Sequence, residues 1–114
     1  MTNAVLEVDP NVATETIATN AGITLVDFTA EWCAPCRAIG PVLEQLAAEQ
    51  EDLTVLKVDV DAAPEFAATY AVMSFPTLIF FVAGQPVHRH VGARGIVFFR
   101  EELERVRDAM ASES

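Results

Sequence analysis

The sequence predicts an α/β domain, a three-layer α/β/α sandwich with a mixed central sheet. Two observations predict this class. Short apolar runs typical of strands alternate with stretches of helical periodicity, which implies parallel strands covered by helices on both faces. Near the C-terminal end a turn at Gly84 joins two consecutive strands and adds an antiparallel pair. The 114 residues have the length of one domain, so we expect a single domain over residues 1–114.

The first part of the chain reads as strand, helix, strand. A short strand near residues 3–7 leads to a turn at Asp9, and a helix then runs to about Asn20. Gly22 follows, where glycine commonly ends a helix. The continuous apolar run at 23–30 predicts a buried strand.

The middle of the chain continues the alternation. Residues 34–50 predict a helix, because their apolar residues recur every three or four positions. Pro41 lies inside this helix and should kink it, since proline lacks the N–H and clashes with the preceding turn. A strand at 53–60 follows, and then a short helix at 63–70, whose early Pro64 suits a first turn.

The C-terminal part predicts a hairpin and a last helix. The strongly apolar strand 77–82 is joined by the turn at 83–86 to a strand at 87–91. Residues 96–110 place their apolar side chains on one helical stripe. We expect core packing for four phenylalanines and exposed strand positions for two histidines, namely Phe80, Phe81, Phe98 and Phe99, and His88 and His90.

Composition excludes several classes of function. Seven Lys and Arg stand against 17 Asp and Glu, and the formal charge of −10 argues against nucleic acid or an anionic membrane as partner. The longest uninterrupted apolar run, at 78–83, is far too short to span a bilayer. The first residues show neither the basic nor the apolar stretch of a secretory signal, so we expect a cytoplasmic protein.

The pattern that carries chemistry is Trp32-Cys33-Ala34-Pro35-Cys36, at the junction of a strand and a helix. A helix N-terminus stabilises an anion, which lowers the pKa of the Cys33 thiol and favours its reactive thiolate. Cys36 follows about one helical turn later, so the two sulfurs can close a small ring. Pro35 stiffens that loop.

Other interpretations of these residues stay open at this point. The two cysteines could be half of a zinc site, with His88 and His90 as the remaining ligands, or two unrelated core cysteines. Asp27 stands in the middle of a buried strand, and burial should raise its pKa and keep it largely neutral. A paired or edge-exposed Asp27 is the alternative.

Over residues 3–110 the chain resembles the thioredoxin family, whose fold is the one expected above. It departs from the usual family pattern at Ala34, where glycine is common, at Thr29, where tryptophan is common, and at Arg37, where lysine is common. None of these changes removes a reacting group. The matching stretches are 26–28, 30–37, 58–61, 74–78 and 91–93.

The resemblance implies roles for several residues. Asp27 would take the proton from the Cys36 thiol, directly or through a water. Lys57, the only lysine in the chain, would lie near Asp27 and temper its pKa, although a lysine that extends to the surface is an equal alternative. Pro76 would follow a cis peptide bond and face the cysteines, and its missing N–H would leave neighbouring backbone free to pair with an extended substrate.

A shallow apolar patch around Cys33 should bind the substrate, because small exposed apolar patches mark interaction sites. Gly92 would allow close approach of a partner backbone. The residues of this docking patch are Trp32, Pro35, Phe75, Pro76, Gly92 and Ala93.

The expected activity is general protein disulfide reduction by dithiol–disulfide exchange at Cys33 and Cys36. The resemblance implies a thioredoxin reductase as the partner that restores the dithiol. The chain has no nucleotide-binding glycine motif, so NADPH and flavin would belong to that partner, and the chain itself would need no cofactor and no metal. We expect a monomer. An oxidase or isomerase, or a binding module in which redox chemistry is incidental, are the alternatives.

Overall fold

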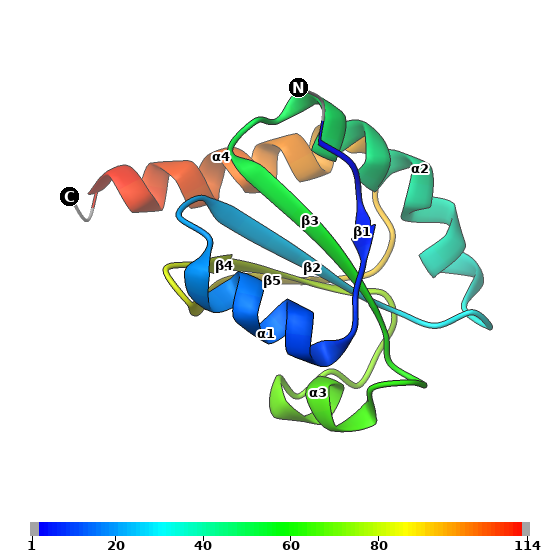
Figure 1. Ribbon diagram of the computed structural model, residues 1–114. Helices are drawn as coiled ribbons and strands as arrows, with labels where there is room; N and C mark the ends of the chain where they lie inside the picture. Colours follow the sequence, from blue (N-terminus) through cyan, green and yellow to red (C-terminus); the bar gives the residue numbers. More distant parts are fainter. Residues whose placement is uncertain (1–2, 113–114) are drawn as a thin grey trace.

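The computed structural model describes residues 3–112 and shows one five-stranded mixed sheet with helices on both faces (Figure 1). The predicted order of elements, β-α-β-α-β-α-β-β-α, is confirmed. None of the described helices has the length and apolar character needed to cross a membrane. The elements are β1 Leu6–Glu7, α1 Pro10–Thr19, β2 Ile23–Thr29, α2 Ala34–Glu49, β3 Leu53–Asp59, α3 Pro64–Thr69, β4 Thr77–Val82, β5 Gln85–Val91 and α4 Ile96–Ser112.

The sheet has the strand order β1-β3-β2-β4-β5, which places β2 at its centre. The first three strands of that order run parallel, and β4 and β5 are antiparallel to their neighbours. In this register Asp27 of β2 lies beside Lys57 of β3 and Leu78 of β4, and Glu7 of β1 lies beside Lys57. A row of side chains that are remote in sequence is thereby brought to one level of the sheet.

Two hydrophobic cores lie on opposite faces of the sheet. The first packs α1 and α3 against one face, around Phe28 and Phe66, whose rings stack at 5.5 Å. The second packs α2 and α4 against the other face, around Leu43, Phe80 and Leu103. Because side chains alternate across a strand, Asp27 and Lys57 point to the α2 and α4 side.

Local sequence explains how the helices begin. Asp9 caps α1 by accepting a hydrogen bond from the Val12 N–H at 2.9 Å, and Pro10 takes the first helical position. Cys33 stands at the same capping position of α2. That helix continues through Pro41 as one element, and a kink there stays a prediction.

Two expectations were wrong. The first strand covers only Leu6 and Glu7 rather than residues 3–7. His88 and His90 are half-buried against α4 rather than exposed, since β5 turns them toward that helix. His88 Nε2 lies 3.0 Å from the carboxylate of Glu102, and the His90 ring packs 4.4 Å from that of Phe98.

The expectation for the phenylalanines was largely met. Phe80, Phe81 and Phe99 are fully buried, and Phe98 packs against the second core while remaining partly exposed.

Candidate functional site

The two cysteines meet where β2 gives way to α2. Cys33 and Cys36 form a disulfide, with their Cα atoms 5.3 Å apart. The Cys36 N–H donates to Cys33 Sγ at 3.2 Å, so a free N–H of the first helical turn points at this sulfur. In the dithiol form the same N–H and the helix dipole stabilise a Cys33 thiolate. The pair is therefore arranged for reversible disulfide chemistry.

The arrangement does not resemble a zinc site. Each cysteine sulfur is bonded to the other, while His88 and His90 lie on β5 against α4. Within residues 3–112, no group of three or more His, Cys, Asp or Glu side chains is placed to hold a metal ion.

Asp27 is buried in the sheet beneath α2, with only 2% of its surface exposed. Burial raises its pKa from 3.8 to about 7, and the positive charge of Lys57 opposes part of that rise. Its Oδ1 has no hydrogen-bond partner among the described residues. A carboxyl group in this state can take up or release a proton near neutral pH.

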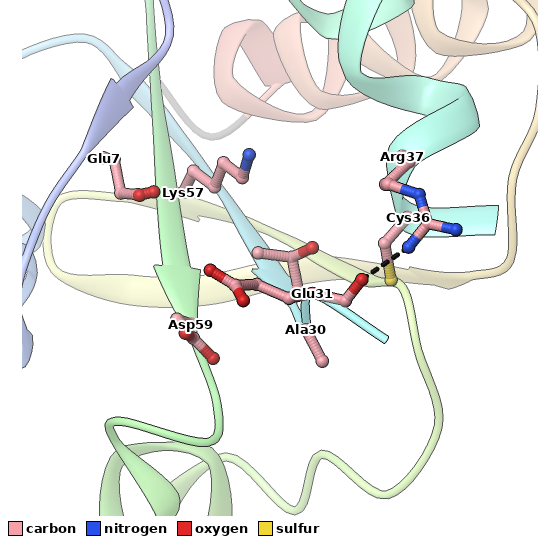
Figure 2. Close-up of a pocket in the computed structure, with 8 residues that line it drawn as sticks. Glu7, Ala30, Glu31, Cys36, Arg37, Lys57 and Asp59 are labelled. Atoms are coloured by element: carbon pink, nitrogen blue, oxygen red, sulfur yellow. Dashed lines mark hydrogen bonds between the residues drawn. The ribbon is translucent and has the colours of Figure 1, made fainter. Parts of the chain in front are cut away.

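Two cavities reach this region, and Cys36, Lys57 and Glu7 line both. The larger, about 390 Å³, continues past Arg37, whose guanidinium donates to the backbone carbonyl of Glu31 (Figure 2). The smaller, about 230 Å³, reaches Asp27. Lys57 thus lies beside Asp27 instead of lying fully in solvent.

The Phe75–Pro76 peptide bond is cis, as the resemblance implied. Pro76 is a buried residue. Its backbone carbonyl accepts a hydrogen bond from the Gly92 N–H at 2.9 Å. Gly92 has φ +109°, a conformation that favours glycine. This hydrogen bond joins the loop before β4, which carries Phe75 and Pro76, to the loop after β5, which carries Gly92 and Ala93. Ala93 is exposed.

Trp32 is an exposed part of the docking patch, with 64% of its surface accessible. Its indole N–H donates to Asp61 at 2.9 Å, and its ring meets Phe75 edge-on at 5.7 Å between centroids. Ala34 and Pro35 are exposed on the first turn of α2. An aromatic surface is therefore held in place beside the disulfide.

Sequence reasoning missed four residues of this region. Glu7, Gly40 and Glu44 line the cavity that Asp27 also lines. No local pattern marks them, because they come from β1 and α2 and meet Asp27 only in the folded chain. Met73 is 87% exposed two residues before Phe75, and an apolar residue beside a predicted docking patch was a usable signal.

Comparison with known proteins supports this chemistry. The family model described as Thioredoxin matches residues 4–105. The thioredoxin of Mycobacterium tuberculosis (strain H37Rv) is 50% identical over 99 residues, which are 86% of this chain and 84% of that protein. The bifunctional thioredoxin reductase/thioredoxin of Mycobacterium leprae is 52% identical over 83 residues, 72% of this chain and 18% of that protein. The solved structure of a mutant thioredoxin from Halobacterium salinarum NRC-1 superposes with a TM-score of 0.83 at 33% identity, covering 90% of this chain and 89% of that one.

Proposed function

Because the chain belongs to the thioredoxin family, we propose that its two cysteines act in a fixed order, in which Cys33 attacks and Cys36 resolves. The protein is a thiol–disulfide oxidoreductase that reduces protein disulfides by dithiol–disulfide exchange at this pair. The order rests on one observation, the hydrogen bond from the Cys36 N–H to Cys33 Sγ. It stabilises negative charge on Cys33 in the dithiol form and so makes that sulfur the nucleophile.

The first step is attack on the substrate. The Cys33 thiolate attacks one sulfur of a target disulfide, a mixed disulfide forms, and the other target sulfur leaves as a thiolate. The docking patch supports this step, since Trp32 and Phe75 offer apolar surface beside the sulfur. The backbone next to the cis-proline Pro76 would pair with an extended segment of the target.

The second step releases the target. Asp27 accepts the proton of the Cys36 thiol, and the Cys36 thiolate attacks Cys33 Sγ. The Cys33–Cys36 disulfide forms, the bond to the target breaks, and the electron pair leaves on the target sulfur. The burial of Asp27 and its pKa of about 7 support this role, and Lys57 would keep that pKa from rising further. Ala34 and Pro35 would tune the stability of the disulfide by limiting the freedom of the loop.

A thioredoxin reductase would return the dithiol. The Mycobacterium leprae relative, which carries both names, supports a reductase partner. NADPH and flavin would belong to that reductase, while this chain would act without a cofactor, as a monomer, in the cytoplasm. Its targets would be proteins with accessible disulfides.

Two cysteine variants test the order of attack. Cys33→Ser should abolish turnover of a model protein disulfide, because serine supplies no thiolate. Cys36→Ser should accumulate a mixed disulfide with the substrate, detected by mass spectrometry under non-reducing conditions. Full activity of Cys33→Ser would contradict the assignment. Equilibration with glutathione buffers separates a reductase, with a strongly reducing potential, from an oxidase or isomerase.

A further inference from the structure

Asp27 can act in every turnover only if its proton has a way out, so this inference rests on the proposed function. The side chain is almost fully buried, and its Oδ1 has no partner among the described residues. It nevertheless faces the smaller cavity, whose volume of about 230 Å³ can hold several water molecules. The buried acid therefore borders a space that water can fill.

The walls of this cavity come from separate parts of the chain. Lys57 belongs to β3, Glu7 belongs to β1, and Val5 directly precedes β1. The remaining wall is one side of α2. Glu44 Oε1 of α2 accepts a hydrogen bond from the Val5 N–H at 2.8 Å, so this carboxylate ties the residue before β1 to the middle of the helix. Asn3 holds the same segment at the end of α2, where its side chain donates to the Gln50 carbonyl at 3.2 Å. The α2 residues that line the cavity are Cys36, Gly40, Leu43 and Glu44.

The groups that face Asp27 include both signs of charge. Lys57 is positive, Glu7 and Glu44 are negative, and Cys36 is the thiol that gives up the proton. The neighbour on β4, Leu78, carries no charge. Glu7 and Lys57 lie side by side on neighbouring strands (Figure 2), and both residues line each of the two cavities.

We propose that this cavity is the proton route between Asp27 and solvent, and that Glu44 is a positioning residue that keeps the route in shape by holding Val5 against α2. In resolution the proton passes from the Cys36 thiol to Asp27. It then leaves through the cavity to water, and the released target thiolate takes up a proton from solvent. Asp27 returns to its charged form for the next turnover, and no other reactant is needed.

Gly40 offers a way to close the route without removing a charge. A Cβ added to Gly40 meets no atom within 4 Å apart from its chain neighbours and the backbone of its own helix, so the position opens on empty space. Long side chains of a helix point back toward the preceding turn, so methionine here would extend toward Cys36, four residues earlier. Gly40→Ala is the matched control, because it also replaces glycine by a good helix former but adds only a single methyl group.

The experiment measures attack and resolution separately. The reduced protein is mixed rapidly with a protein disulfide, the reaction is quenched with acid, and mass spectrometry counts mixed disulfide and intramolecular disulfide over time. Gly40→Met should slow resolution about tenfold and leave attack unchanged, while Gly40→Ala stays within about twofold of the natural protein. In an Asp27→Asn background, Gly40→Met should have no further effect on resolution, because the proton donor to the route is gone.

Several outcomes would overturn the proton route. Unchanged resolution in Gly40→Met would do so. An equal slowing in the Asp27→Asn background would show that methionine only crowds Cys36, and it would leave the proposed function intact. The proposed function would fail on a different result, namely that Cys33→Ser still attacks the protein disulfide.

A second pair of variants keeps the proposal testable if Gly40→Met does not fold. Glu44→Ala should speed exchange of the Val5 amide hydrogen and shift the pH midpoint of resolution downward by about half a unit, because water then reaches Asp27 more freely. Glu44→Gln keeps an oxygen acceptor for Val5, and its midpoint should lie closer to that of the natural protein. Faster exchange of the Val5 amide with no shift of the midpoint relative to Glu44→Gln would refute the role of Glu44.

Discussion

Two buried carboxylates lie on the α2 and α4 side of the sheet, and their surroundings are opposite. Asp27, at the centre of the sheet, is 2% exposed and has an oxygen without a hydrogen-bond partner among the described residues. Glu102 of α4 is 5% exposed, but His88 lies 3.0 Å from one of its oxygens and Arg105 lies 3.2 Å from the other. Burial alone therefore does not assign a role to an acid.

The difference lies in what each carboxylate does to the fold. Glu102 accepts a hydrogen bond from Arg105 at one oxygen and has His88 of β5 within 3.0 Å of the other, so these contacts link α4 to β5. Asp27 has one nearby lysine and a buried oxygen, Oδ1, without a hydrogen-bond partner among the described residues, so it costs stability whenever it is charged. Asp27 keeps this unfavourable state at the place where the proposed chemistry needs a proton acceptor, and this supports the proposal that it acts as one.

The largest expected effect is the contribution of Asp27 to the pH dependence of the free energy of unfolding. The folded-state pKa of about 7, against the ordinary 3.8, means that the folded protein holds a proton that the unfolded chain has lost. Stability should therefore fall as pH rises from about 4 through 7, by up to about 4 kcal/mol. Oxidised Asp27→Asn should be more stable than the natural protein at pH 8, and the difference should vanish near pH 4.

Urea unfolding of the oxidised protein across this pH range measures the effect, because the disulfide removes the cysteines from the titration. Asp108→Asn, at an exposed position of α4, is the control for loss of one negative charge. An Asp27→Asn protein that is less stable than the natural one at pH 8 would show that Asp27 is a paired, structural acid.

The second effect has the opposite sign and concerns Glu102. Glu102→Ala should lower the free energy of unfolding by about 1 to 2 kcal/mol at pH 7, because it removes the acceptor of the Arg105 hydrogen bond and leaves the half-buried His88 without its neighbouring carboxylate. Disulfide exchange rates should stay unchanged. A double-mutant cycle with His88→Ala measures the coupling between the two side chains. A coupling near zero would mean that the 3.0 Å contact adds nothing to stability.

The smallest expected effect on stability comes from the titration of His90, which interacts electrostatically with Glu102. Burial lowers its pKa below 6.5, opposed by Glu102 and by a hydrogen bond with the backbone at Gly92, while Arg94 and His88 lower it further. The folded protein binds this proton less readily than the unfolded chain, so stability should fall as pH drops below 6.5. His90→Phe should weaken that dependence. An NMR titration that places the His90 pKa above 6.5 would contradict the expectation.

Much of the fold could be predicted because its signals are local. Apolar runs and three-to-four spacings marked every helix and strand in the right order, and the Gly84 turn marked the hairpin. The strand near residues 3–7 was overestimated. Pairing with β3 covers only Leu6 and Glu7, and nothing in the local sequence states where that pairing stops. His88 and His90 were placed wrongly because an edge strand can still be covered by a helix on one face.

The sequence by itself determined the reactive pair, because two cysteines at the start of a helix lie one turn apart whatever surrounds them. It also indicated that Asp27 would be buried, from the apolar residues on either side. Only the tertiary structure decided which residues surround Asp27 and its cavity. They are Lys57 on the neighbouring strand, Glu7 on the edge strand β1, and Gly40 and Glu44 on α2. Local patterns specify backbone periodicity, whereas the field and the water around a buried charge depend on packing between segments that are far apart in the chain.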